Sequence, residues 1–369
     1  MYRTFRARNF KCFADLTIPN MARINLIAGM NGSGKTALLE ALFIHSGINP
    51  ELAIRVNVFR GINPVTFEVR KYAEAPWDSV FMMHDTTRII ELEGDYDNYP
   101  RRIIRLRGIH DMEETEKTSN HIRNFIAANK RSRKSPLLSE TIQTLRLDFS
   151  QGNRKSSHDL MLDHIIDEQG ERVRIRVNPP SPPSPYQTVF LPARFIRMEE
   201  DIDRFGRLEA AKRLDYILKT LKILEPRLKD LAIITEKGIP LIAGDIGFSK
   251  LVPVPYMGEG AARLMSLLLA IGYAENGIVL LDEIENGLHH TVLEKVWRLV
   301  AEAARTLNVQ IFATTHSFEC IRAAHVAFVS RKDYDFRLYR LERMKNETSV
   351  VTYSKETLSA AVEAGYEVR

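Results

Sequence analysis

The sequence contains few cysteines and no long apolar run. Only Cys12 and Cys320 occur in 369 residues, which excludes a disulfide framework and offers no cluster of metal ligands, so we expect two reduced thiols. The longest nearly apolar stretch, residues 264–274, falls well short of the roughly 20 residues that span a bilayer. The basic residues 1–6 are followed by no apolar segment of the kind that a secretory signal requires. We therefore expect a cytoplasmic protein with no membrane partner.

Positive charge is distributed unevenly along the chain. The net charge is +5 and the isoelectric point is near 9.0, yet residues 101–134 alone contain ten Lys or Arg against four Asp or Glu. A local field of this sign attracts nucleic acid through counterion release, or an acidic protein through the same electrostatics. A solvated surface is the alternative interpretation. The segment, which includes Lys130, Arg131, Arg133 and Lys134, makes DNA a candidate partner.

A glycine-rich octapeptide lies between a β-rich run and a helix-forming run. It reads Gly29-Met30-Asn31-Gly32-Ser33-Gly34-Lys35-Thr36 and fits the phosphate-loop pattern G-x-x-x-x-G-K-[ST]. The glycines let backbone N–H groups converge on phosphates, and the following helix directs its positive end at them. We expect Gly29, Asn31, Gly32, Ser33 and Gly34 to line the phosphates of ATP. Lys35 would reach the β and γ phosphates, and Thr36 would ligate Mg²⁺.

A second motif consists of an apolar run that ends in two acids. Ile278-Val279-Leu280-Leu281 is typical of a buried strand, and Asp282 and Glu283 follow it directly. Acids often end strands, so this pattern is weak evidence by itself. Beside a phosphate loop it indicates nucleotide hydrolysis, in which Asp282 holds Mg²⁺ and Glu283 polarises the attacking water.

Three further segments extend the series. Glu285-Asn286-Gly287-Leu288-His289 and Thr314-Thr315-His316-Ser317 resemble the D-loop and switch histidine of ABC-type ATPases. The opening Arg8-Asn9-Phe10-Lys11-Cys12-Phe13 resembles the start of the SMC, RecF and OLD (overcoming lysogenisation defect) branch. The resemblance covers roughly residues 1–47 and 188–330. It implies that His316 contacts the γ phosphate and senses its loss, and that Lys11 lies near the nucleotide.

The signature loop of this family is best matched by Met257-Gly258-Glu259-Gly260-Ala261-Ala262-Arg263. Gly258 stands where the family usually has a serine whose hydroxyl touches the γ phosphate of the facing protomer. Gly258 and Gly260 can still offer backbone N–H groups, and Arg263 could supply positive charge across the interface. The resemblance thus implies a head-to-tail pair with a second copy of the chain. A tight turn before a core helix is the alternative.

Strand and helix patterns alternate in both terminal parts of the chain, which favours the α/β class. With the resemblance, we expect an ABC-type P-loop ATPase core with a mixed sheet flanked by helices, plus an inserted β/helical subdomain. Residues 1–50 and 188–369 would form the core and its helical subdomain. Residues 51–187 would form the insertion, β-rich at first, then helical and basic over 111–150, and closed by a proline-rich connector. Apolar spacing over residues 208–231 predicts one helical region, bent at Pro226.

The resemblance to OLD-like AAA ATPases implies hydrolysis of ATP to ADP and phosphate. These ATPases commonly act with a Toprim nuclease, in the same chain or a neighbouring one, in anti-phage defence. The recognisable ATPase ends near residue 330, and the stretch after it is short for a nuclease domain. We therefore expect an ATPase that forms an ATP-dependent head-to-tail dimer or a larger homo-oligomer and controls a separate effector, a nuclease. Two alternatives are an SMC/RecF-like DNA-repair ATPase that acts on DNA directly and the ATPase subunit of an ABC transporter.

Overall fold

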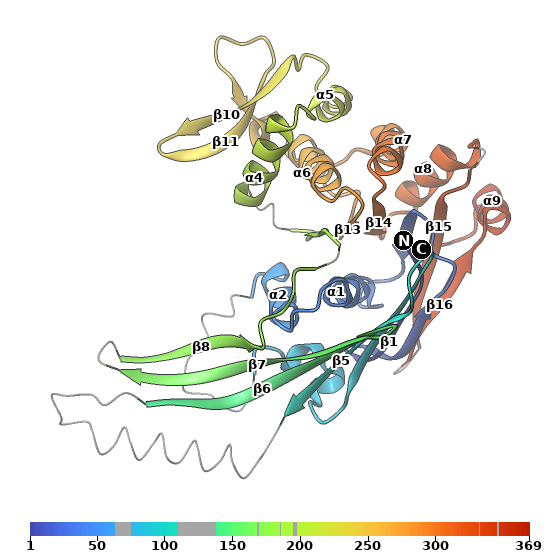
Figure 1. Ribbon diagram of the computed structural model, residues 1–369. Coiled ribbons are helices and arrows are strands. Elements are labelled where there is room, and N and C mark those ends of the chain that lie inside the picture. Colours follow the sequence, from blue (N-terminus) through green and yellow to red (C-terminus); the bar gives the residue numbers. More distant parts are fainter. Residues whose placement is uncertain are drawn as a thin grey trace. The chain divides into compact units, whose positions relative to one another are not determined.

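The chain folds into two compact units (Figure 1). Unit 1 comprises Met1–Arg3, Ile18–Leu39 and Tyr186–Arg369, and unit 2 comprises Thr4–Thr17 and Glu40–Pro185. The computed structural model describes residues 1–62, 75–109, 138–167, 170–184, 186–194, 198–331, 333–344 and 347–369. Lys130, Arg131, Arg133 and Lys134 lie outside these ranges.

A six-stranded mixed sheet organises unit 1. Its strands are β3 (Ile24–Ala28), β9 (Thr188–Leu191), β13 (Ile278–Leu281), β14 (Gln310–Thr314), β15 (Phe336–Met344) and β16 (Glu347–Tyr353), in the order β16-β15-β3-β14-β13-β9. Only β16 pairs antiparallel; the other neighbours are parallel. Every residue of β3, β13 and β14 is buried, as expected for parallel strands covered on both faces. The carboxyl ends of the parallel strands therefore meet at one edge of the sheet.

Helices with extensive buried apolar faces cover the sheet of unit 1. They include α6 (Glu259–Tyr273), α7 (His290–Thr306), α8 (Phe318–Val329) and α9 (Lys355–Glu363). In α7 the buried side chains recur at helical spacing: Leu293, Val296, Trp297, Val300, Ala301 and Ala304. They join the apolar residues of β3, β13 and β14 in one hydrophobic core. No helix within the described ranges is both long and apolar enough to span a bilayer.

The helical region expected over residues 208–231 is wrong as a single element. The chain instead forms α4 (Met198–Ala210), α5 (Asp215–Leu221) and β10 (Asp230–Glu236). β10 pairs with β11 (Ile239–Asp245), which in turn pairs with β12 (Val252–Pro253). The break after α4 coincides with Lys212, whose φ is +56°, a conformation that no α-helix contains. Leu221 and Leu231 are still buried in the core. The apolar spacing therefore identified buried residues but not their secondary structure.

Unit 2 is built on a seven-stranded sheet in the order β2-β1-β4-β5-β6-β7-β8. The strands are β1 (Tyr2–Phe10), β2 (Phe13–Ile18), β4 (Ile90–Tyr96), β5 (Arg102–Ile109), β6 (Leu138–Gln151), β7 (Arg154–Asp167) and β8 (Gly170–Asn178). A helix, α2 (Leu52–Phe59), and two short 3₁₀ turns (Asp78–Val80 and Met82–His84) complete the unit. Helix was expected within residues 111–150, but residues 138–150 form a strand, because β6 pairs with β5 and β7 on both sides. Residues 111–137 lie outside the described ranges.

The N-terminal strands are grouped differently from the expectation. Residues 1–50 were expected to belong to the ATPase core, whereas residues 4–17 and 40–50 belong to unit 2. For residues 4–17 the reason is strand pairing, since β1 lies between β2 and β4 in the seven-stranded sheet. Helix α1 (Lys35–Ser46) is shared between the units, with the division after Leu39.

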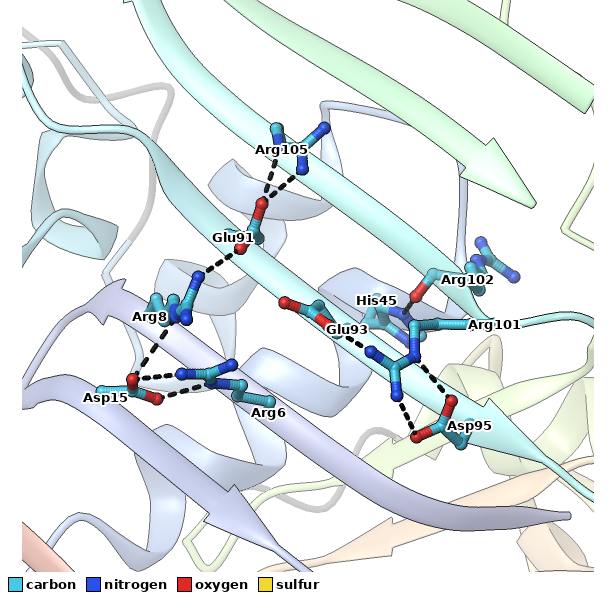
Figure 2. Close-up of polar contacts among 10 residues, drawn as sticks. All are labelled: Arg6, Arg8, Asp15, His45, Glu91, Glu93, Asp95, Arg101, Arg102 and Arg105. Atoms are coloured by element: carbon cyan, nitrogen blue, oxygen red, sulfur yellow. Dashed lines mark hydrogen bonds and ion pairs between the residues drawn. The ribbon is translucent and has the colours of Figure 1, made fainter. Parts of the chain in front are cut away.

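One face of the seven-stranded sheet carries a network of arginines and acids (Figure 2). Glu91 pairs with Arg8 on β1 at 2.9 Å and with Arg105 on β5 at 2.6 Å. Further pairs are Arg101 with Glu93 and Asp95, Arg107 with Asp148, and Arg146 with Asp159. Residues 101–109 contribute four of the ten basic residues expected to attract DNA. Three of these are paired with acids, and Arg102 is fully buried, so the described part of the basic segment is largely neutralised.

Candidate functional site

The phosphate-loop motif occupies the turn between β3 and α1 in unit 1. Gly29 has a φ of +144°, and a Cβ there would lie 2.6 Å from the Leu341 carbonyl oxygen, so glycine is required on both backbone and steric grounds. Lys35 is buried and its Nζ donates to the carbonyl oxygens of Gly29, at 2.6 Å, and Met30, at 3.1 Å. Burial lowers the pKa of Lys35, whereas the nearby Asp282, Glu283 and Glu285 oppose this shift. The Lys35 side chain is therefore held against the loop whose bound phosphates it is expected to contact.

Asp282, at the end of β13, lies next to the start of α1. The Thr36 hydroxyl donates to Asp282 Oδ2 at 2.9 Å. From β14, the Thr314 hydroxyl donates to Asp282 Oδ1 at 2.6 Å. A hydroxyl and a carboxylate are oxygen ligands of the kind that Mg²⁺ prefers, with waters and phosphate oxygens completing the shell. The side chains present therefore fit the Mg²⁺ site predicted from the sequence.

Glu283 is held in place by its backbone and by a neighbouring amide. Its φ of +53° is uncommon for a residue with a side chain, and its backbone N–H donates to the Thr314 hydroxyl at 2.8 Å. The Asn286 amide donates to Glu283 Oε2 at 2.8 Å and also to the Ala193 carbonyl oxygen at 3.3 Å. Strained backbone of this kind is typical of functional sites. The carboxylate is thus fixed at the edge where β13 ends.

His316 follows β14 and lies beside the same acids. Its Nδ1 is 3.3 Å from Glu285 Oε1 and 3.8 Å from Glu283 Oε1. Glu285 Oε1 also accepts from the His316 backbone N–H at 2.9 Å and from the Thr315 hydroxyl at 2.8 Å. The side chain of His316 remains about half exposed. The structure therefore brings Lys35, Thr36, Asp282, Glu283 and His316 together.

Arg263 does not lie where the sequence indicated. It was expected at a surface facing a second protomer, but it is only 5% exposed. Its guanidinium donates to the Pro192 carbonyl oxygen and to the Asp282 carbonyl oxygen, both at 2.6 Å. Desolvation by burial lowers the pKa of this group. Arg263 therefore ties helix α6 to the strand ends of its own chain.

The two glycines of the signature-like loop have different surroundings. Gly258 precedes α6 with a φ of +115°, and space around its Cβ position is open. A Cβ on Gly260 would lie 2.4 Å from the Gly287 carbonyl oxygen, so this glycine permits close packing of α6 on the segment after β13. Gly258 thus lies in open space, whereas Gly260 is packed against its own chain. Contact of either glycine with a facing protomer stays a prediction.

Lys11 lies in unit 2 and neutralises a buried acid. Its Nζ is 2.6 Å from Glu40 Oε2, and Arg60 Nε is 2.6 Å from Glu40 Oε1. The Glu40 side chain is fully buried. Burial lowers the pKa of Lys11, and the Glu40 carboxylate opposes that shift. The expected position of Lys11 near the nucleotide stays a prediction.

Comparison with known proteins identifies the family of this chain. The family described as "AAA domain, putative AbiEii toxin, Type IV TA system" matches residues 24–321. The chain belongs to this AAA family. It is 23% identical over 352 residues to an ATP/GTP phosphatase of Helicobacter pylori, covering 87% of this chain and 86% of that protein. It is also 35% identical over 65 residues to an uncharacterized protein of Methanocaldococcus jannaschii, covering 18% of this chain and 57% of that protein.

Two solved structures are similar to the AAA chain at low identity. The SMC head domain from Thermotoga maritima has a TM-score of 0.41 at 12% identity, covering 96% of this chain and 99% of that chain. An Smc head domain with an extended coiled coil, bound to the C-terminal domain of ScpA derived from Pyrococcus furiosus, has a TM-score of 0.47 at 12% identity, covering 98% of each chain.

Sequence reasoning assigned no role to three residues of the AAA site. Thr314 orients both Asp282 and Glu283, Asn286 holds the Glu283 carboxylate, and Glu285 contacts His316. Each of them lies in a motif that the sequence identified, a few residues from a predicted site residue, and this nearness was the only sequence signal for a role in the site. Their roles depend on contacts between separate strand ends, which the motif does not specify.

The buried position of Arg263 predicts a large effect on the stability of the AAA chain. In Arg263→Ala the carbonyl oxygens of Pro192 and Asp282 would lose a charged donor in a buried site, at a cost of about 2–4 kcal/mol. Arg298, an exposed arginine of α7 paired with Glu294, provides the control, because Arg298→Ala should cost at most about 1 kcal/mol. Urea denaturation without nucleotide measures both. Equal midpoints for Arg263→Ala and Arg298→Ala would contradict the assigned contacts.

Proposed function

We propose that this chain is a Mg²⁺-dependent ATPase whose turnover controls a separate effector protein, a Toprim-type nuclease, in anti-phage defence. The single observation that carries the ATPase part is the convergence of the phosphate loop, Asp282, Glu283 and His316 at one sheet edge. The relative named as an ATP/GTP phosphatase supports the same activity. The effector and its biological role rest on the resemblance to OLD-like ATPases.

In the proposed reaction each residue has a separate task. The backbone N–H groups of residues 29–34 and the Lys35 ammonium bind the phosphates, with Lys35 exchanging its bonds to Gly29 and Met30 for phosphate oxygens. Thr36 and Asp282 would hold Mg²⁺, which would supply charge neutralisation for the phosphates. Glu283 accepts a proton from the attacking water while the oxygen of that water attacks the γ phosphorus. The bond between that phosphorus and the ADP oxygen breaks, and ADP and phosphate leave.

His316 would act on the same γ phosphate from the end of β14. Glu285 fixes the backbone of His316 and lies beside its Nδ1, which leaves Nε2 as the ring nitrogen available to the nucleotide. Loss of the γ phosphate would remove that contact. His316 would thereby report hydrolysis to the segment that follows it, beginning with α8.

Separating binding from turnover tests the assigned roles. Lys35→Ala should weaken ATP binding by about 100-fold or more, because at least two charge-assisted bonds are lost. Glu283→Gln should bind ATP normally and slow turnover by about 100- to 10,000-fold, since only the base is lost. Lys295→Ala and Glu302→Gln, exposed positions on α7, serve as matched controls. ATP affinity by calorimetry and phosphate release are the measurements; wild-type turnover in Glu283→Gln would refute the base assignment.

The site is proposed to be completed by a second copy of the chain. Gly258 has open space around it and immediately precedes α6, the helix that Arg263 ties to Asp282. A phosphate-facing N–H group at Gly258 could therefore reach the nucleotide of a facing protomer. Arg263, assigned to that interface from the sequence, is not part of this proposal because it is buried in its own chain.

Mixing two inactive variants tests the shared site. Lys35→Ala disables the phosphate loop, and Gly258→Asp places a negative charge at the signature position. Each protein alone should be inactive, whereas an equal mixture should recover about a quarter of wild-type activity, because half of the pairs are mixed and carry one intact site. Thermal unfolding of Gly258→Asp controls for folding. The shared site is refuted if wild-type turnover per chain stays constant at concentrations where sedimentation shows only monomers.

The elements that follow β14 build the sheet and the core of unit 1. β15 and β16 add two strands to the sheet that holds the phosphate loop, and α9 packs into the core of unit 1. This part of the chain therefore serves the ATPase fold. Direct action on DNA is the second candidate, and the neutralised arginines of residues 101–109 do not favour it.

The effector proposal predicts ATP hydrolysis without DNA cleavage. The purified chain, supplied with Mg²⁺ or Mn²⁺ and ATP, should release phosphate and leave linear and supercoiled DNA intact. Glu283→Gln is the matched control, because a contaminating nuclease would act equally in both preparations. Cleavage by the wild-type chain that is lost in Glu283→Gln would show that the ATPase itself drives cutting, and the separate effector would be rejected.

A further inference from the structure

Strand β15 ends beside the phosphate loop. It pairs in parallel with β3, so that Arg340 is level with Ala28, the last residue before the loop. The Leu341 carbonyl oxygen would lie 2.6 Å from a Cβ on Gly29. Two residues further on, Arg343 Nη1 donates to the Gly32 carbonyl oxygen at 3.3 Å. The end of β15 therefore forms a wall of the loop.

The side chains at this wall are exposed. Arg343 is exposed and its Nη1 donates to the loop backbone, and its planar guanidinium carries further N–H donors and two flat faces that can meet a ligand. Met30, within the loop, is 81% exposed, and Met344, next to Arg343, is 67% exposed. Large apolar side chains exposed beside a ligand loop suit contact with an apolar part of that ligand.

The order of the strands decides which end of a nucleotide lies here. Glu283 and His316 follow β13 and β14, which lie on one side of β3, whereas β15 lies on the other. The γ phosphate must face Glu283 for the proposed hydrolysis. Because neighbouring strands are about 4.8 Å apart, a triphosphate that starts at β13 and β14 and crosses the loop directs its nucleoside toward β15.

We propose that Arg343 binds the purine nucleoside of ATP or ADP, with its guanidinium stacked on the base and with Met30 and Met344 as apolar neighbours. This inference rests on the ATP binding proposed above. Guanidinium groups stack favourably on aromatic faces. The bond to Gly32 holds the arginine at the loop, so that little conformational freedom is lost when the nucleotide binds.

Comparing ligands with and without a nucleoside tests the role of Arg343. In a Glu283→Gln background, which prevents turnover, Arg343→Ala should weaken the binding of ATP and ADP by about 10-fold. Affinity for inorganic tripolyphosphate should change by less than about twofold, because the phosphates are held by the loop and Lys35. Arg343→Lys keeps the charge and a donor for Gly32 but loses the planar face, so it should also lose about fivefold or more for ADP.

Arg337 provides the matched control. It is on the same strand and also donates to a backbone carbonyl oxygen, that of Asn20, at 3.3 Å, but it is level with Asn25, near the opposite end of β3. Arg337→Ala should bind all three ligands like the parent protein. Unchanged ADP affinity in Arg343→Ala, or an equal loss for tripolyphosphate, would overturn the nucleoside contact while leaving the ATPase proposal intact. If the parent protein binds no ATP, both proposals fail.

Discussion

Asp282 is the residue on which the arrangement of the site depends. Its carboxylate accepts hydrogen bonds from Thr36 at the start of α1 and from Thr314 on β14, and its backbone carbonyl accepts from Arg263 on α6. Three segments far apart in the sequence are thereby fixed to the end of one buried strand. Because charged hydrogen bonds in a buried site are costly to break, a shift in any one of these segments would be transmitted to the Asp282 carboxylate.

The neighbouring residues place the chemistry next to this anchor. Glu283 takes an uncommon φ of +53° immediately after Asp282, which turns its side chain to Asn286. Glu285, two residues later, accepts the backbone N–H of His316. Glu283 and His316 are therefore both positioned by contacts with residues 285 and 286, which follow β13. A strained backbone conformation of this kind persists only where surrounding contacts hold it. One such contact is the hydrogen bond from the Glu283 backbone N–H to the Thr314 hydroxyl.

The sequence predicted the parts of this site that are local. The phosphate loop and the acids after β13 are short motifs whose strand and helix context is also local, so residues such as Lys35 and Asp282 could be assigned. The buried position of Arg263 could not be predicted in this way, because it depends on a contact with Pro192, 71 residues earlier in the chain. Likewise, residues 208–231 have helical apolar spacing, yet Lys212 and the pairing of β10 with β11 override it. Where a local sequence pattern is compatible with more than one secondary structure, tertiary contacts determine which one forms.

The position of Arg263 bears on the proposed pairing of two copies of the chain. A residue at the opposing nucleotide would sense it directly, whereas Arg263 contacts Asp282 within its own chain and lies on α6, the helix that Gly258 precedes. If Gly258 contacts a partner's nucleotide, a displacement of α6 would be felt at the Asp282 of the same chain. Each site would thus be linked to the other through α6, and this linkage requires that α6 and the end of β13 move as one body. The close approach of Gly260 to the Gly287 backbone, which leaves no room for a Cβ, provides that rigidity.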